Sequence, residues 1–257
     1  MKASCAQTIL ITGATGAIGS ALAELYAGPA TTLILLGRSA SALAELAQRC
    51  QDKGSRTITH ALDLRNHGLL MERLTEISTT EQIDLAIVNA GVNTNIGPDG
   101  AGEQWAVVEE LLEVNVTACL ATVQALLPAM RARRSGQIAL ISSLAAYYGL
   151  PLTPSYCASK AAIKAYGEAL RGWLAPEGIR VNVVMPGYVA SRMCHDMPGP
   201  KPFLWSAARA AATIRRGLSA DRPRISFPFP LNLGCWLLSV IHPTISQRIL
   251  RLLNYHA

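Results

Sequence analysis

The segment Thr8-Ile-Leu-Ile-Thr-Gly-Ala-Thr-Gly-Ala-Ile-Gly19 decides the fold. An apolar run over 8–11 is followed by glycines at 13, 16 and 19, and then by a helical pattern over 17–27. Glycines between a strand and a helix permit a tight turn and the close approach of a ligand, and free amides at a helix start attract a pyrophosphate. The segment therefore predicts a dinucleotide-binding turn; the alternative is an ordinary tight turn.

Apolar runs and helical stretches alternate along the rest of the chain. We expect strands near 7–12, 32–36, 56–61, 83–88, 137–142 and 179–184, and helices near 17–27, 40–53, 66–79, 103–133 with a break, and 155–175. This alternation predicts an α/β fold of one domain: a Rossmann fold with a doubly wound parallel sheet. The chain has 257 residues, 50% of them hydrophobic, which is enough to bury a substantial core.

The second expected strand ends in Gly37-Arg38-Ser39. A carboxylate at this point would hold the ribose 2′-hydroxyl of NAD, but the chain has none there. A guanidinium can instead form a bidentate pair with a 2′-phosphate. We therefore predict that the cofactor is NADP(H), contacted by Arg38; the alternative is an exposed arginine that opens the next helix.

Tyr156 and Lys160 lie four residues apart in helix-favouring sequence. Residues with this spacing share a helix face, so Lys160 can reach toward the Tyr156 oxygen. A nearby positive charge stabilises the phenolate and lowers the pKa of a tyrosine from its usual value of about 10. The pair predicts a proton donor for a carbonyl oxygen; the alternative is a chance pair on a solvated helix.

With these features the chain resembles the short-chain dehydrogenase/reductase family from about Ile9 to Ser191. The resemblance also rests on Asp63-Leu64, Asn89-Ala90-Gly91, Asn115, Ser143 and Pro186-Gly187. It implies a catalytic set of Asn115, Ser143, Tyr156 and Lys160. Together with the glycine turn and Arg38, it implies cofactor contacts from Gly13, Thr15, Gly16, Ile18, Gly19, Arg38, Ser39, Asp63, Leu64, Asn89, Ala90, Gly91, Tyr156, Lys160, Pro186, Gly187, Val189 and Ser191.

The resemblance implies a mechanism of carbonyl reduction. Ser143 and Tyr156 would hydrogen-bond the substrate carbonyl oxygen, where negative charge develops. Lys160 would bind the ribose hydroxyls and lower the pKa of Tyr156, and Asn115 would hold a water that resupplies protons through Lys160. The glycine spacing is more similar to the family's extended branch, and Ser191 stands where the family usually has threonine.

The six cysteines are scattered without paired spacing, and the five histidines form no ligand-spaced cluster. This pattern argues against a disulfide framework and against a zinc site, so we predict no metal and a reducing, cytoplasmic location. Met1-Lys2 precedes an apolar run that passes directly into the glycine turn, which favours a first strand over a secretory signal.

The last quarter of the chain carries all of the basic excess. Residues 201–257 contain eight Lys/Arg and one acid, a net charge of +7, whereas residues 1–200 contain 15 and 16, a net charge of −1. The uncharged run 227–241 is shorter than the about 20 apolar residues that span a bilayer. The pattern over 244–254 predicts a basic amphipathic helix. We expect peripheral membrane contact through 227–254, on the inner face, or equally packing on a partner subunit or on the chain's own core.

We assign residues 1–200 to the dinucleotide-binding and catalytic Rossmann core, and 201–257 to a substrate lid and a basic apolar extension of the same domain. Nucleic acid is not an expected partner, because no recognised binding motif accompanies the charge. Arg224–Phe227 is the candidate for the last strand. The resemblance implies a homodimer through the helices near 103–133 and 155–175.

Several apolar side chains are expected to form a substrate pocket and its lid: Tyr147, Tyr148, Leu150, Leu152, Met193, Met197, Phe203 and Trp205. The first functional prediction is an NADPH-dependent oxidoreductase that interconverts a carbonyl and an alcohol on an apolar or lipid-like small-molecule substrate. The second is a reductase or epimerase that acts on a sugar or sugar nucleotide in surface polysaccharide synthesis. The third is a non-catalytic NADP-binding sensor or scaffold.

Overall fold

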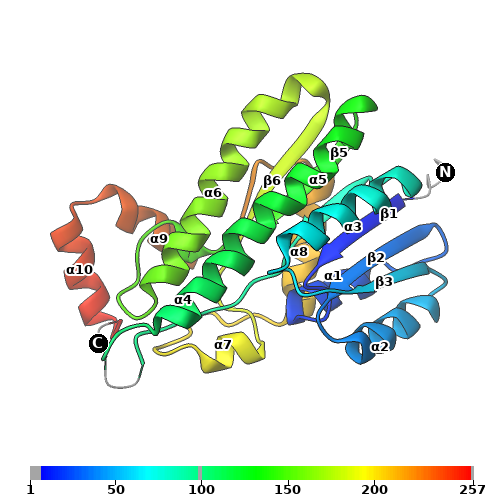
Figure 1. Cartoon of the computed structure of the whole chain (residues 1–257). Coiled ribbons are helices and arrows are strands. Elements are labelled where there is room, and N and C mark those ends of the chain that lie inside the picture. Colours follow the sequence, from blue (N-terminus) through cyan, green and yellow to red (C-terminus); the bar gives the residue numbers. More distant parts are fainter. Residues whose placement is uncertain (1–6, 98–99, 256–257) are drawn as a thin grey trace.

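The protein forms a single sheet of seven strands with helices on both faces (Figure 1). The structure is a computed structural model that describes residues 7–97 and 100–255. Every strand pair is parallel, in the order β3-β2-β1-β4-β5-β6-β7. The strands are β1 (Gln7–Thr12), β2 (Thr31–Gly37), β3 (Arg56–Ala61), β4 (Leu85–Val88), β5 (Gly136–Ile141), β6 (Ile179–Pro186) and β7 (Arg224–Phe227). The predicted doubly wound α/β fold is confirmed.

Helices cover the two faces of the sheet in separate sets. One face is covered by α1 (Ala17–Tyr26), α2 (Ala40–Gln51) and α8 (Ala207–Ser219), and the other by α3 (His67–Thr80), α5 (Ala118–Ala132) and α6 (Pro154–Leu174). In β1, Ile9 and Ile11 pack in the first core and Leu10 packs in the second. Strands buried on both faces are continuous apolar runs, which is why they stood out in the sequence.

The predicted break in the helix over 103–133 is a π-helical turn, η1 (Glu113–Thr117), between α4 (Trp105–Leu112) and α5. The stretch Trp105–Ala132 is apolar and long enough to cross a membrane by length and composition. However, 61% of its most apolar 18-residue stretch is buried inside the fold, where α5 packs against the sheet and α3. It is therefore a core helix.

The strand candidate Arg224–Phe227 is confirmed as β7, which pairs with β6 at the sheet edge. After the short helix α7 (Arg192–Asp196) and α8, the chain ends in α9 (Leu231–Val240) and α10 (Pro243–Leu252). These two helices project from one end of the molecule (Figure 1). The predicted amphipathic helix over 244–254 is present as α10. Most other predicted boundaries agree within two residues; Met1-Lys2, which was predicted to precede the first strand in place of a secretory signal, lies outside the described residues.

Candidate active site

The turn between β1 and α1 has no space for side chains at two of its glycines. Gly13 has a φ of +62°, and a Cβ placed on it would lie 2.7 Å from the Cα of Ala90. A Cβ on Gly19 would collide with the carbonyl oxygen of Gly13. The Asn89 amide donates to the carbonyl oxygens of Thr12 (3.2 Å) and Gly13 (3.0 Å). Asn89, predicted to contact the cofactor, thus also locks the turn against the end of β4.

The residues of this turn fit a dinucleotide. Gly16 is the N-cap of α1 and supplies no side-chain cap, so the amides of the first helical turn remain available to a phosphate. Gly13, Thr15, Gly16 and Ile18 line one end of a cavity of about 870 Å³. The turn lies where the strand order reverses, between β1 and β4, which is the usual ligand-binding position in such sheets.

Arg38 follows β2 at the same cavity wall. Its side chain is 64% exposed, and its Nη1 lies 3.5 Å from Glu110 Oε1, a loose ion pair that leaves the guanidinium accessible. Ser39 caps α2, because its Oγ accepts from the Ala42 amide at 3.2 Å.

Asp63 also lines the cavity, followed by the buried Leu64. The Asp63 carboxylate accepts hydrogen bonds from the Arg65 side chain, with its shortest contact at 2.6 Å. These bonds hold the pKa of Asp63 below its usual value. Sequence reasoning missed Arg65, and its position two residues after Asp63 was the available signal. The pair leaves the negative charge of Asp63 largely compensated at this end of the cavity.

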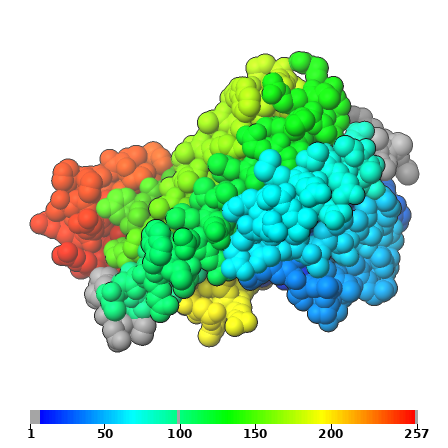
Figure 2. Space-filling view, in the orientation of Figure 1, coloured from blue at the N-terminus to red at the C-terminus, as the bar shows by residue number. Residues whose placement is uncertain are grey.

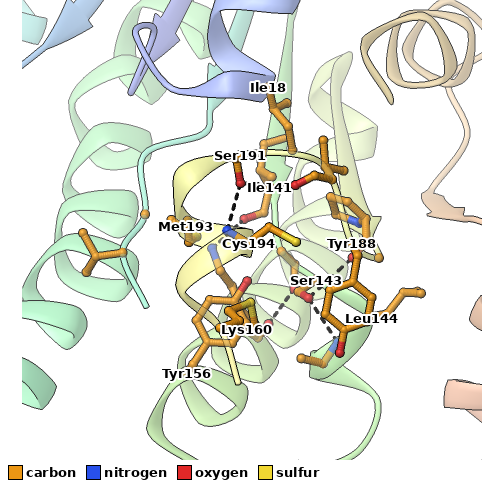
Figure 3. A pocket seen from close by; sticks show the side chains of 18 of the residues that line it. Ile18, Ile141, Ser143, Leu144, Tyr156, Lys160, Tyr188, Ser191, Met193 and Cys194 are labelled. Carbon is orange, nitrogen blue, oxygen red and sulfur yellow. Dashed lines mark hydrogen bonds between the residues drawn. The ribbon is translucent and has the colours of Figure 1, made fainter. Parts of the chain in front are cut away.

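Three of the four predicted catalytic side chains, Ser143, Tyr156 and Lys160, converge at the carboxyl end of β5 and the first turns of α6 (Figure 3). Ser143 follows β5; its Oγ accepts from the Ala145 amide at 3.1 Å and donates to the Pro186 carbonyl oxygen at 3.5 Å. The Lys160 Nζ donates to the Ile141 carbonyl oxygen at 3.2 Å and lies 5.7 Å from the centroid of the Tyr156 ring. All three side chains line the same cavity as the glycine turn.

Burial dominates the ionisation of this pair. It raises the pKa of Tyr156 to about 12, although the nearby Ser143 hydroxyl acts in the opposite direction. The predicted lowering of the Tyr156 pKa is therefore wrong for this chain by itself. The physical reason is that burial favours the uncharged phenol over the phenolate. Burial also lowers the pKa of Lys160 from 10.5 to about 8.

Asn115 lies in the π-helical turn and is buried. Its Nδ2 donates to the Val92 carbonyl (2.9 Å) and to Ser159 Oγ (3.1 Å), while its Oδ1 accepts from the Val92 amide (2.8 Å). The side chain therefore braces the segment after β4, and its role in holding a water stays a prediction. A Cβ on Gly91 would lie 3.2 Å from both Asn115 Oδ1 and Lys160 Nζ, so this glycine keeps space beside Lys160.

The segment after β6 completes the cavity. The Gly187 amide donates to the Phe227 carbonyl at 2.7 Å, and a Cβ on Gly187 would lie 2.9 Å from Pro228 Cδ. Val189 forms a bridge with Trp205, and Ser191 caps α7 by accepting from the Cys194 amide at 3.0 Å. Pro186, Gly187, Val189 and Ser191 all line the cavity, as predicted for a nicotinamide-binding segment, but their contacts with a cofactor stay predictions.

The apolar half of the cavity differs from the predicted pocket in four residues. Tyr148, Leu150, Met193 and Met197 line it, but Tyr147, Leu152, Phe203 and Trp205 do not. Trp205 is partly buried and stacks on Phe227 with ring centroids 5.1 Å apart, against the core that α8 covers, and Phe203 is 53% exposed. Leu152 packs behind the cavity wall, and Tyr147 lies against Arg224 outside it.

Residues 201–257 were assigned to a substrate lid, but the sequence did not indicate which residues of the C-terminal helices form this part of the wall. Its residues from α9, α10 and their flanks are Leu231, Gly234, Cys235, Leu237, Leu238, Ile241, Ile249, Leu250, Leu253 and Tyr255. Tyr255 OH lies 2.8 Å from Tyr188 OH and donates to the Pro200 carbonyl at 2.6 Å, which ties the chain end to the loop after β6. No local pattern could reveal a contact across 67 residues.

Fold and site together define a Rossmann-fold oxidoreductase with a serine, tyrosine and lysine at its centre. Residues 7–200 match the sequence profile of the family described as "short chain dehydrogenase". An "uncharacterized oxidoreductase" of Myxococcus xanthus is 32% identical over 237 residues, covering 91% of this chain and 92% of that protein. The chain belongs to the short-chain dehydrogenase/reductase family and is an enzyme of that type.

Two further proteins are similar to the chain. The ketoacyl reductase HetN of a Nostoc species is 32% identical over 185 residues, which cover 72% of this chain and 64% of that protein. A short-chain dehydrogenase from Sphingobium yanoikuyae, solved in complex with NADPH, superposes with a TM-score of 0.80 at 24% identity, covering 92% of this chain and 96% of that one. The second likeness concerns the fold alone.

Proposed function

We propose that this enzyme transfers hydride between NADP(H) and the carbonyl or alcohol group of an apolar small molecule. The observation that carries the proposal is one continuous cavity. Its first end is the glycine turn with Arg38, its centre holds Ser143, Tyr156 and Lys160, and its far end is the apolar wall from the C-terminal helices.

A bound nicotinamide nucleotide would supply or accept the hydride. The chain's own residues supply the rest. The Ser143 and Tyr156 hydroxyls, which line the same cavity, can both donate to a carbonyl oxygen placed between them. Because burial holds the pKa of Tyr156 at about 12, its phenol carries a proton at neutral pH and can act as the general acid. A charged Lys160 favours the phenolate left behind.

The chemistry of the far wall supports an apolar substrate. From Leu231 to Tyr255, the residues that line the cavity include no charged side chain. Their one hydroxyl, on Tyr255, is already bonded to Tyr188 and Pro200. A sugar or sugar nucleotide would need several convergent hydrogen-bonding groups, which this wall lacks. Similarity to a ketoacyl reductase is consistent with a carbonyl on an apolar chain.

A screen of NADPH oxidation across aliphatic and aromatic ketones, acyl compounds and keto-sugars tests the proposal. We expect turnover of apolar ketones or ketoacyl compounds, with kcat/KM rising as apolar carbon is added, because added methylenes fill the far wall at about 0.8 kcal/mol each. Turnover of keto-sugars alone would support the sugar-directed alternative. Tight NADPH binding without turnover of any class would support the sensor alternative.

The preference for NADP(H) rests on Arg38 and can be tested by Arg38→Asp. We expect the Kd for NADPH to rise roughly 10- to 100-fold, because a charge-assisted hydrogen bond of about 1.5–3 kcal/mol is replaced by repulsion. The Kd for NADH should change little. Fluorescence titration of both nucleotides measures this, with Arg49→Asp on α2 as the control, since Arg49 pairs with Glu24 outside the cavity. Equal shifts in both variants would remove Arg38 from cofactor selection.

We further propose a homodimer in a cytoplasmic setting. Support for the dimer comes from exposed aromatic side chains on the helices that the resemblance implies, Trp105 on α4 (70% exposed) and Trp173 on α6 (53% exposed). Support for the setting comes from the cysteines at 50, 119, 157, 194 and 235, which are unpaired.

A further inference from the structure

The C-terminal helices lie at one end of the molecule (Figures 1 and 2), and they present apolar side chains to solvent. Their exposed fractions lie between 45% and 84%. We call this set the tail surface; it consists of Leu233, Trp236, Leu237 and Val240 on α9, and Ile245, Leu252 and Leu253 on and just after α10. Soluble proteins rarely expose so many large apolar side chains together unless the surface binds something.

The fold explains why these side chains are not buried. Leu238 on α9 belongs to a small hydrophobic core that also contains Leu250 of α10. Leu231, at the start of α9, packs against a second cluster that contains Leu144. The opposite side of α9 carries Leu233, Trp236 and Val240 and has no charged residue. A helix that is apolar on all sides normally lies in a protein core or in contact with lipid. Here its outer side lies on the molecular surface.

The charge of the tail favours an anionic membrane over a second copy of the chain as the partner of this surface. The sequence from Arg222 to its last residue contains no aspartate or glutamate. Arg248 and Arg251 are exposed on α10, beside Ile245 and Leu252, and within residues 7–97 and 100–255 neither forms an ion pair. A second copy placed on this surface would bring arginines together without carboxylates to match them. Anionic lipid head groups would complement them.

The tail surface is continuous with the cavity. Leu237 and Leu253 line the cavity and are also 47% and 54% exposed, so they form a rim where the cavity meets the tail surface. Leu238 and Leu250 line the same wall but are 9% and 3% exposed, deeper inside. An apolar molecule that passes this rim remains in apolar surroundings as far as the catalytic centre.

We propose that the tail surface inserts into the interfacial region of one leaflet of an anionic membrane, and that the apolar substrate enters the cavity from that leaflet between Leu237 and Leu253. The ten residues of α9 are about half of what spans a bilayer, so the helix lies in the interface and does not cross it. The membrane docking is inferred from the tail surface alone, whereas the entry route also depends on the proposed function.

Vesicle co-sedimentation of the full chain tests the docking. We expect binding to vesicles of phosphatidylcholine mixed with phosphatidylglycerol, and much weaker binding to phosphatidylcholine alone. The double change Arg248→Gln with Arg251→Gln should lower the partition coefficient roughly tenfold or more, because each basic residue at an anionic surface contributes about 1 kcal/mol. The change Trp236→Gln with Val240→Gln should lower it at least as much, by removing apolar contact with the acyl region.

Matched controls lie on other helices. Leu69→Gln with Met71→Gln replaces exposed apolar residues on α3, and Arg215→Gln with Arg216→Gln replaces exposed arginines on α8. Both controls should bind vesicles like the parent, and thermal melting shows whether each variant folds. Equal binding by the tail variants and the controls would overturn the docking. The docking would also be overturned if the full chain did not bind vesicles and formed a dimer that the tail variants dissociate.

The entry route has its own readout. The variant Trp236→Gln with Val240→Gln should lose kcat/KM for a long-chain ketone dissolved in the vesicles, and retain kcat/KM for a short ketone in solution. If the variant retained kcat/KM for both ketones, the entry route would be overturned and the docking would remain intact. Vesicle binding without turnover of any ketone would contradict the proposed function and not the docking.

Discussion

Replacing Tyr156 with phenylalanine is expected to lower kcat roughly 1,000-fold, within the range that a general acid contributes. The phenol lines the cavity beside Ser143, and it carries its proton at neutral pH because burial raises its pKa to about 12. The ring is buried, and phenylalanine preserves its shape. Steady-state kinetics with a ketone substrate and NADPH measures the loss.

The affinity of the Tyr156→Phe variant for NADPH should stay within about threefold of the parent, since the loss of a typical neutral hydrogen bond costs only about 1 kcal/mol. Tyr147→Phe is the matched control, because Tyr147 lies nearby but outside the cavity. It should retain activity. A Tyr156→Phe variant with activity near that of the parent would show that the proton comes from another group.

Replacing Lys160 with methionine is expected to move activity and stability in opposite directions. Turnover should fall by at least 100-fold, because the phenolate left on Tyr156 loses its nearest positive charge. The cofactor-free protein should become more stable at pH 7. Burial lowers the pKa of Lys160 from 10.5 to about 8, so folding carries a cost on the order of 3 kcal/mol to keep the side chain charged. The lost bond to Ile141 makes this value an upper limit.

The pH dependence of both quantities follows from the same group. The folded state releases the Lys160 proton near pH 8, whereas the unfolded state holds it to about pH 10.4, so the unfolded state binds more protons between these values. The cost to stability of keeping Lys160 charged in the folded state is full below about pH 8, and it disappears as the pH rises from about 8 to about 10.4. Carbonyl reduction by the parent should decline above about pH 8, as Lys160 loses its charge.

Melting temperatures from pH 7 to pH 10 and kinetics over the same range check this prediction. The Lys160→Met variant should melt several degrees higher than the parent at pH 7, and the difference should narrow as the pH rises. Lys164→Met is the matched control, since Lys164 lies one turn further along α6 and pairs with Glu168 at 2.9 Å. A lower melting temperature for Lys160→Met at pH 7 would show that the ammonium stabilises the empty site.

Local patterns were sufficient to predict where much of the candidate site lies in the fold. The turn glycines, the strand ends that carry Ser143 and Pro186, and the helix that carries Tyr156 and Lys160 were all placed correctly. In each case a short segment sets the backbone geometry, and the parallel sheet brings the ends of its strands to one edge. Membership of the family was visible for the same reason.

Predictions that depended on burial or distant contacts were less successful. Trp205 was expected at the pocket, but it stacks on Phe227 in the core. Tyr156 was expected to have a lowered pKa, but its surroundings are buried and Lys160 Nζ bonds a backbone carbonyl. No sequence pattern indicated a role for Tyr255, because its contact with Tyr188 joins residues that are 67 positions apart in the chain.

By itself, then, the sequence determined the α/β sheet, the glycine turn between β1 and α1, and the positions of Ser143, Tyr156 and Lys160 at the ends of their elements, because spacing along the chain controls backbone hydrogen bonding and which side chains share a face. Only the tertiary structure decided that α9 and α10 close the apolar end of the cavity and leave the tail surface outside. The reason is that burial, and the pKa shifts that follow from it, depend on which distant segments pack together.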